Sequence, residues 1–335
     1  MGKTNIEYLD QTWSPIAMRC TPISEGCANC WHLKMCDRLK ANPAVEDFQR
    51  LAYSDTKWPY ITNRTNDPLR MKKPRRIGVQ FMGDLFHEAV PFDFIDRIFA
   101  IMGMTQRHTY LLLTKRPDRM AEYLSGSHDR YQSILSVAYS LELVPEDTAR
   151  PYLQEGGMQL VDFYPHVYFG VTAENQARAD ERIPTLLQRP AAKHFVSIEP
   201  MLGPVDFAHI LIDGATSLNA LTGNIHHVGY VPRNYPGKSA KLDWVVCGGE
   251  TGPGARPMHP DWVRSVRDQC QASGTPFFFK GWGDWAPRAN EDHEEGKREL
   301  IWPDGSLAVR VGKRAAGRLL DGRTWEEFPT TEGSE

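Results

Sequence analysis

Short apolar runs alternate with amphipathic segments along most of the chain. Apolar positions at helical spacing predict helices over 92–104, 117–124, 176–188 and 260–273. Pro184 should kink or delay the third helix, while Pro260 opens the fourth and Gly274 closes it. The apolar runs themselves indicate buried strands, over 76–82, 108–114, 166–172, 194–199, 243–249 and 276–282.

Repeated strand–helix units of this kind predict an α/β fold with a parallel sheet. They close most readily into a partial TIM barrel of the (β/α)6 type, to which a short strand before Cys20 would add a seventh strand. We expect this barrel over residues 1–286, with an insertion at about 125–160 and a charged extension over 287–335. In the extension, Asp304 and Gly305 separate two alternating runs, which is typical of a hairpin.

Composition limits the classes of protein to consider. The 335 residues supply enough apolar side chains for a large core, and the net charge is only −3. A nucleic-acid partner would therefore need a local basic patch. No signal peptide or bilayer-spanning run is found, so we expect a soluble, cytoplasmic protein without a membrane partner. Six cysteines in a reducing compartment favour metal or redox chemistry over disulfides.

Three of these cysteines, Cys20, Cys27 and Cys30, are close together near the N-terminus. Three thiolates leave one position open, either on a zinc ion or on one iron of a four-iron cluster. Cys36 or His32 is a possible fourth ligand, although we favour core packing for Cys36 and a surface or hydrogen-bonded position for His32. The isolated Cys247 and Cys270 are expected to be buried in the core.

Polar or charged side chains follow nearly every predicted strand. Chemistry on parallel α/β folds takes place where strands end, so these residues are site candidates. A carboxylate directly after an apolar strand is costly unless it has a partner. The candidates are Gly83, Asp84, Lys115, Arg116, Glu174, Asn175, Glu199, Pro200, Gly248, Gly249, Glu250, Lys280 and Trp282.

Several strings resemble the Gp37/Gp68 family of phage proteins, which looks like a branch of the radical S-adenosylmethionine superfamily. They include DQTWSPIAMRCTPISEGCANCW, QFMGDLFHEAVP, FGVTAENQARADERIPTLLQ, FVSIEPMLGPVD, VVCGGETGPGARPMHPDWVRSVRDQC and AGRLLDGRTWEEFP. The resemblance implies that Cys20, Cys27 and Cys30 bind a 4Fe-4S cluster on an N-terminal loop. The open iron would bind S-adenosyl-L-methionine, and an external electron donor would reduce the cluster to give a 5′-deoxyadenosyl radical.

The resemblance also implies roles for strand-end residues. Gly83 and Asp84 would hold the amino group of S-adenosylmethionine. Thr172, Glu174, Ser197 and Glu199 would contact its ribose and carboxylate, or the substrate, and Glu250 and Lys280 would act on the substrate. Two features depart from the superfamily pattern. Six residues, not three, separate Cys20 from Cys27, and Gly248–Gly249–Glu250 follows a late strand where the superfamily has Gly-Gly-Glu after the second.

The expected substrate is DNA. A basic cluster precedes the first long strand and could neutralise phosphates, although such clusters are often only solvated surface; it comprises Arg64, Arg70, Lys72, Lys73, Arg75 and Arg76. The resemblance implies an isomerase that converts Nα-glycinylthymidine to Cα-glycinylthymidine during thymidine hypermodification, which protects phage DNA from host restriction. Two alternatives stay open, a zinc-stabilised nucleic-acid-binding protein and a radical S-adenosylmethionine DNA-repair lyase.

Overall fold

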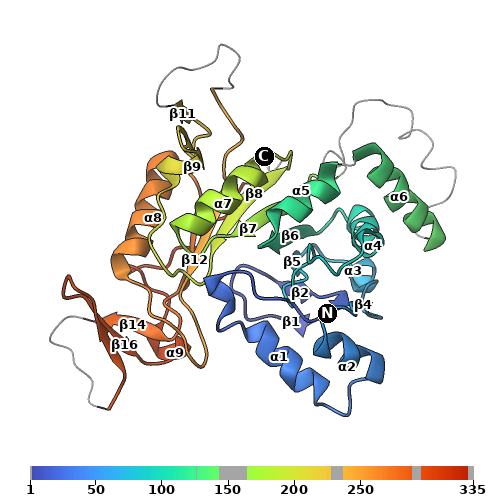
Figure 1. Ribbon diagram of the computed structural model, residues 1–335, viewed down its shortest axis with the longest axis horizontal. Helices are drawn as coiled ribbons and strands as arrows, with labels where there is room; N and C mark the ends of the chain where they lie inside the picture. Colours follow the sequence, from blue (N-terminus) through green and yellow to red (C-terminus); the bar gives the residue numbers. More distant parts are fainter. Residues whose placement is uncertain (1, 126, 143–163, 228–236, 289–295, 331–335) are drawn as a thin grey trace. The chain divides into compact units, whose positions relative to one another are not determined.

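The computed structural model describes residues 2–125, 127–142, 164–227, 237–288 and 296–330 (Figure 1). The chain divides into two compact units. The first comprises Met1–Pro22, Cys30–Gly170 and Arg189–Lys193, and the second comprises Ile23–Asn29, Val171–Gln188 and His194–Glu335. Both units combine parallel strands with helices, so the predicted α/β class is confirmed.

The first unit contains the strand order β1-β2-β5-β6. Strand β1 (Gly2–Lys3) is antiparallel to β2 (Gln11–Trp13), while β5 (Arg76–Val79) is parallel to both β2 and β6 (Thr109–Thr114). Strand β5 stops before the predicted residue 82 because Gln80 takes a left-handed φ of 55°. The Gln80 side-chain amide bonds to both backbone groups of Ile16, which ties the end of β5 to the start of β3 (Ile16–Ala17).

Helices pack on this sheet and on one another. Helix α4 (Phe92–Gly103) follows β5, and α5 (Pro117–Ser125) follows β6, as the sequence predicts. Helix α6 (Ser127–Ser140) contacts α4 and lies in the expected insertion, whose residues 143–160 lie outside the described residues. The polar segment before β5 forms α1 (Trp31–Lys40), α2 (Asp47–Ser54), β4 (Tyr60–Ile61) and α3 (Asp67–Arg70).

Strand β7 (Val167–Thr172) carries the chain from the first unit into the second, where β8 (Lys193–Ile198), β12 (Trp244–Gly248) and β13 (Phe277–Gly281) are parallel neighbours. Helix α7 (Gln176–Leu187) contains Pro184 and continues past it to Leu187. Helix α8 (Pro260–Ser273) ends at Gly274, whose φ of 69° is the left-handed cap that glycine favours.

Shorter elements complete the second unit. Three strands that the sequence did not predict form the order β11-β10-β9, from β9 (Ile210–Asp213), β10 (Thr216–Leu218) and β11 (Ile225–His227), after the short 3-10 helix η4 (Phe207–His209). The predicted hairpin is confirmed, because β15 (Glu299–Ile301) pairs with β16 (Leu307–Arg310), which also pairs with β14 (Trp285–Arg288). Helix α9 (Lys313–Ala316) follows.

The boundary expected after residue 286 falls within β14 and within the second unit. Among the described residues, no helix combines the length and the apolar character needed to cross a bilayer.

Candidate functional site

Cys20 lies in the first unit beside a buried arginine. The Arg116 guanidinium is 3.7 Å from the Cys20 Sγ, and it also donates to the hydroxyl and carbonyl oxygens of Thr21 at 2.8 and 3.1 Å. The same guanidinium pairs with Asp84 at 3.2 Å and with Glu88 at 2.8 Å. Burial opposes the charge on Arg116, but Asp84, Cys20 and Glu88 together raise its pKa. A fixed cation here stabilises negative charge on the Cys20 sulfur.

Asp84, expected to bind an amino group, is engaged within the protein. Its carboxylate accepts four hydrogen bonds, two of them from Thr114 Oγ1 and Arg116 Nη1 and two from the backbone N–H groups of Phe86 and Lys115. These donors match the acceptor capacity of a carboxylate. Asp84 therefore positions Arg116, and through it Cys20.

Cys27 lies in the second unit and is the last residue of the 3-10 helix η1 (Glu25–Cys27). This helix begins directly after Ser24. The Ser24 hydroxyl donates to Glu174 Oε1 at 2.5 Å and lies 3.7 Å from the Cys27 Sγ. Glu174 also pairs with Arg182 at 3.0 Å, and both charged side chains are fully buried. Glu174, a carboxylate at the end of a strand, therefore holds Ser24, the residue that precedes the helix containing Cys27.

Glu250 holds the other end of the same segment. It accepts two bonds from the Arg256 guanidinium, at 2.6 and 2.8 Å, one from the Arg256 backbone N–H and one from the Asn29 amide at 3.1 Å. Burial raises the pKa of Glu250, but the hydrogen bonds from Arg256 and Asn29 outweigh it and the net pKa is lowered. Arg256 also donates to the Glu25 carbonyl at 3.1 Å. Residues on both sides of Cys27 are therefore tied to Glu250.

The loop after Glu250 passes very close to the loop after β13. A Cβ added to Gly249 would lie 2.1 Å from the Trp282 carbonyl oxygen, and one added to Gly283 would lie 2.2 Å from that of Glu250. These separations are shorter than any side chain permits, so the glycines set the position of Glu250. The Gly248–Gly249–Glu250 string, of which Glu250 was expected to act on the substrate, therefore has a clear packing role.

The six cysteines fall into two classes. Cys20, Cys27 and Cys30 are partly exposed, and Cys30 is the residue that precedes α1, whereas Cys36, Cys247 and Cys270 are buried. Burial raises the pKa of the Cys36 thiol to about 11 and raises those of Cys247 and Cys270 as well. These three thiols are consequently neutral near pH 7, as the core-packing interpretation expects.

His32, the other possible fourth ligand, is buried against Cys36, with its Nε2 3.5 Å from the sulfur. Burial lowers the pKa of His32 to about 4. Both residues lie on the buried face of α1, so His32 is not a surface residue, and the Cys36 thiol donates to the Met18 carbonyl at 3.5 Å.

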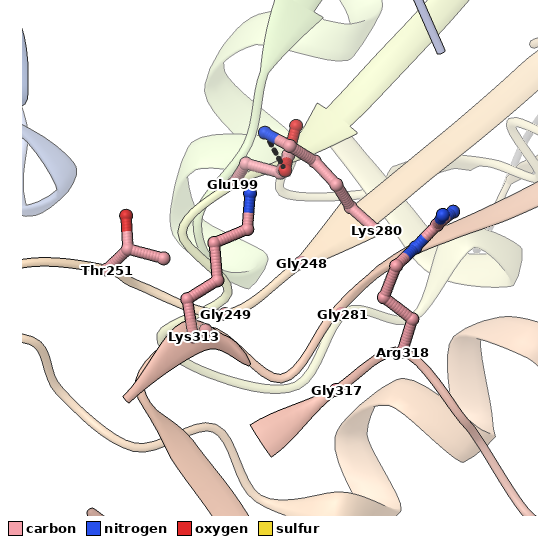
Figure 2. Close-up of a pocket in the computed structure, with 10 residues that line it drawn as sticks. Glu199, Gly248, Gly249, Thr251, Lys280, Gly281, Lys313, Gly317 and Arg318 are labelled. Atoms are coloured by element: carbon pink, nitrogen blue, oxygen red, sulfur yellow. Dashed lines mark ion pairs between the residues drawn. The ribbon is translucent and has the colours of Figure 1, made fainter. Parts of the chain in front are cut away.

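Glu199 is a strand-end carboxylate that lines a pocket. Figure 2 shows its ion pair with Lys280, in which Lys280 Nζ lies 2.8 Å from Glu199 Oε1. The Ser197 hydroxyl donates to the other carboxylate oxygen at 3.1 Å. Thr251, Lys313, Arg318 and five glycines complete the lining. The structure thus places two predicted residues, Glu199 and Lys280, at the pocket, while the predicted Ser197 is buried and bonds to Glu199 from outside the lining.

Thr172 and Gly83, the remaining residues expected to contact S-adenosylmethionine, have structural roles. The Thr172 carbonyl accepts a hydrogen bond from Arg182 at 2.8 Å, and Thr172 itself is buried. Gly83 has a φ of 117°, and a Cβ there would lie 2.8 Å from the Met18 sulfur, so the position requires glycine.

Sequence reasoning missed Ser24, Asn29 and Arg182. Each is paired with a strand-end carboxylate, and Ser24 and Asn29 flank Cys27. The available signal was the cost of a buried carboxylate, which requires such partners without saying which residues supply them.

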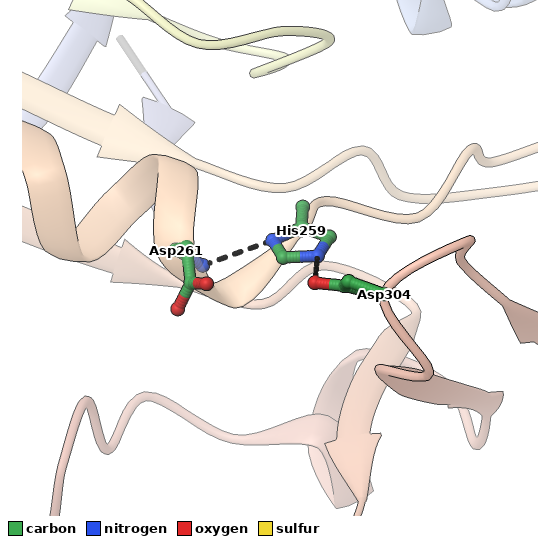
Figure 3. Close-up of side chains that lie close together, drawn as sticks. All are labelled: His259, Asp261 and Asp304. Atoms are coloured by element: carbon green, nitrogen blue, oxygen red, sulfur yellow. Dashed lines mark hydrogen bonds and ion pairs between the residues drawn. The ribbon is translucent and has the colours of Figure 1, made fainter.

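His259, Asp261 and Asp304 form the one group of three His, Cys, Asp or Glu residues in the described ranges whose ligand atoms all lie within 4.8 Å of one another (Figure 3). Both imidazole nitrogens are engaged: Nδ1 accepts from the Asp261 backbone N–H at 3.1 Å, and Nε2 is 3.0 Å from Asp304 Oδ2. His259 therefore caps α8 and fastens the turn between β15 and β16, which explains the cluster without a metal.

One family model, described as "Protein of unknown function (DUF5131)", matches residues 3–329. No curated protein and no solved structure matches the chain.

Proposed function

Since the chain belongs to the DUF5131 family, whose description names no activity, we propose its function from its own residues and from the resemblance of its sequence strings to Gp37/Gp68 proteins: a radical S-adenosylmethionine enzyme that acts on DNA. In this proposal Cys20, Cys27 and Cys30 bind a 4Fe-4S cluster. The strands of the chain form a partial (β/α)6 barrel, and the enzyme works in the cytoplasm with an external electron donor. The specific reaction is the isomerisation of Nα-glycinylthymidine to Cα-glycinylthymidine, which would protect phage DNA from restriction.

The observation that supports this proposal best is the contrast between the two classes of cysteine. Cys20, Cys27 and Cys30 are partly exposed, while the other three are buried and have raised thiol pKa values. Thiolates, not thiols, bind metals. A set of three accessible sulfurs fits a cluster that keeps one iron open, and it does not supply the fourth ligand of a closed zinc site.

The surroundings of the cysteines also fit a cluster. Arg116 Nη1 lies 3.7 Å from the Cys20 sulfur, and the Ser24 hydroxyl lies 3.7 Å from the Cys27 sulfur. Hydrogen bonds and positive charge near cluster sulfurs tune its reduction potential. When bound, the cluster would supply one electron to S-adenosylmethionine and so start radical chemistry.

The protein's own contribution is positioning. Asp84, Glu174 and Glu250 hold the residues beside Cys20 and Cys27 through Arg116, Ser24 and Asn29. Glu199 and Lys280 line the pocket where ligand atoms would be oriented, and the buried Ser197 holds Glu199. Holding a substrate carbon in a fixed place away from water accounts for much of the rate of such reactions.

Metal analysis of matched cysteine variants tests the cluster. Anaerobically prepared wild-type protein should contain about four iron and four sulfide per chain. We expect Cys30→Ala to lose the iron and the cleavage of S-adenosylmethionine, and Cys36→Ala, six residues further along, to keep both. One zinc per chain, lost in Cys36→Ala, would support the zinc-stabilised nucleic-acid-binding alternative and end the radical proposal.

The reaction itself needs a separate test. DNA carrying Nα-glycinylthymidine is incubated with reduced enzyme and S-adenosylmethionine, then digested to nucleosides. The expected product has the same mass as the substrate nucleoside and a different retention time. An unchanged nucleoside, together with cofactor cleavage, would reject the isomerisation while leaving the radical class standing. Reversal of a thymine photoproduct in parallel samples would instead favour the repair lyase.

A further inference from the structure

The pocket beside Glu199 is the least explained feature of the second unit. It lies where β8, β12 and β13 end, and it is closed on another side by α9 and the residues after it. Its empty space is about 410 Å³, part of it open to solvent. Pockets at the carboxyl ends of parallel strands commonly bind small ligands or ligand groups.

Its charged lining is predominantly positive. Lys280, Lys313 and Arg318 contribute three cations, against the single carboxylate of Glu199. Glu199 already pairs with Lys280 at 2.8 Å and accepts from Ser197, so its charge is offset within the pocket. In Figure 2, Lys313 extends from α9 toward the side of the pocket where this ion pair lies. Arg318 is also paired, with Glu326 at 2.8 Å, but Glu326 lies outside the lining. The lining itself therefore keeps an excess of positive charge, which favours an anionic group.

Glycines make up half of the lining, so few side chains fill the pocket. They let the lining segments pack closely: a Cβ at Gly248 would lie 2.8 Å from Glu199 Oε1, and one at Gly281 would lie 2.7 Å from the Gly317 carbonyl. The enclosed space is therefore compact, and compact sites lined by glycine suit phosphate, a small group surrounded by acceptor oxygens.

We propose that this pocket binds a backbone phosphate of the DNA substrate, with Lys313 and Arg318 as its principal cations. The inference rests on the proposed function for the identity of the partner as DNA, and it concerns docking, not the reaction. Lys280, held by Glu199, supplies the third positive charge. A phosphate fixed here would set the register of the strand relative to the site, since phosphate contacts position a nucleic acid while carrying no sequence information.

The test measures how salt affects binding of the full-length protein to a fluorescent thymidine-containing oligonucleotide, by anisotropy over a series of KCl concentrations. Each phosphate neutralised by a protein cation contributes about 0.7 to 0.9 to the slope of log affinity against log salt. We expect Lys313→Gln to reduce that slope by about this amount and to weaken binding roughly 5- to 10-fold at moderate salt. Arg318→Gln should do the same, provided that circular dichroism shows it to be folded.

The matched control is Arg314→Gln, which removes the same charge from the next residue of α9, outside the pocket lining. It should leave both the slope and the affinity nearly unchanged. Equal effects of Lys313→Gln and Arg314→Gln would mean diffuse surface attraction and would overturn the proposal. Inorganic phosphate provides a second probe. If phosphate raises the Tm of the wild type but not of Lys313→Gln, while both proteins bind the oligonucleotide equally well, the pocket binds free phosphate and not a phosphate of DNA.

Iron content and S-adenosylmethionine cleavage are measured on the same preparations. If the protein proves to contain zinc and no cluster, a selective effect of Lys313→Gln on DNA binding would still support this pocket. If the cluster is present and Lys313→Gln binds DNA like the wild type, the pocket assignment fails while the proposed function stands.

Discussion

The buried ion pair between Glu174 and Arg182 yields a quantitative prediction. Both side chains are fully buried, with Arg182 Nη1 3.0 Å from Glu174 Oε2. Within the described residues, Arg182 Nε and Nη2 have no hydrogen-bond partner, while Nη1 also donates to the Thr172 carbonyl. Removing the Glu174 charge would leave the guanidinium buried and poorly compensated.

We expect Glu174→Gln, which keeps the size of the side chain, to lower the free energy of unfolding by about 3–5 kcal/mol, the usual cost of breaking a buried ion pair from one side. The exposed Glu181 carboxylate, 3.9 Å from Arg182 Nε, compensates the charge in part, so the lower end of this range is expected. The corresponding fall in Tm is on the order of 10 °C. Urea unfolding of the metal-free protein, followed by circular dichroism, measures the change.

Two controls accompany this measurement. Glu181→Gln removes an exposed partner and should cost less than about 1 kcal/mol. Glu174→Gln combined with Arg182→Met removes both buried charges and should recover much of the loss, because the stranded charge is then gone. If the free energy of unfolding of Glu174→Gln lies within about 1 kcal/mol of the wild-type value, Arg182 does not need Glu174 to compensate its buried charge, and the reasoning is refuted.

Three further outcomes follow from the same structure. Arg116→Lys should reduce iron retention, measured by metal analysis, because one ammonium cannot reach Asp84, Glu88 and Thr21 together; full retention would contradict the anchoring role. Burial lowers the pKa of His108 below its usual 6.5, so His108 stabilises the fold above that pH and this contribution is lost on acidification; the pH dependence of unfolding should flatten in His108→Gln. Gly283→Ala should lower the free energy of unfolding in urea far more than Gly322→Ala. Both glycines have a positive φ, but only the Cβ added at Gly283 would meet backbone atoms. Equal losses of stability in the two variants would exclude the close approach of the loops at Gly283.

The sequence predicted the main elements of the fold well. Each of the six apolar runs contains a strand, and Gly274 ends α8 as expected, because apolar periodicity and caps are local signals. The β9–β11 strands were missed because they are short and their side chains are mostly exposed or half-buried. Local patterns also do not show where a loop crosses another, as at Gly249 and Gly283.

The residues of the candidate site could largely be predicted from the sequence, but the contacts between them could not. The strand-end carboxylates were found from the sequence, but their partners are distant along the chain: Ser24 and Glu174 are 150 positions apart, and Asn29 and Glu250 are 221 apart. No periodicity relates such pairs. Only the folded chain shows that Asp84, Glu174 and Glu250 support the residues around the cysteines.

The number of hydrogen bonds separates two kinds of strand-end carboxylate. Asp84 and Glu250 each accept four from protein donors, which matches the acceptor capacity of a carboxylate. Glu199 accepts from Ser197 and Lys280 among the described residues, which is half of that capacity, and it lines a pocket. A carboxylate already saturated by the protein serves the fold, whereas one with acceptor capacity beside open space is suited to a ligand. Of these three carboxylates, Glu199 is therefore the one best placed to accept a hydrogen bond from a ligand in the pocket.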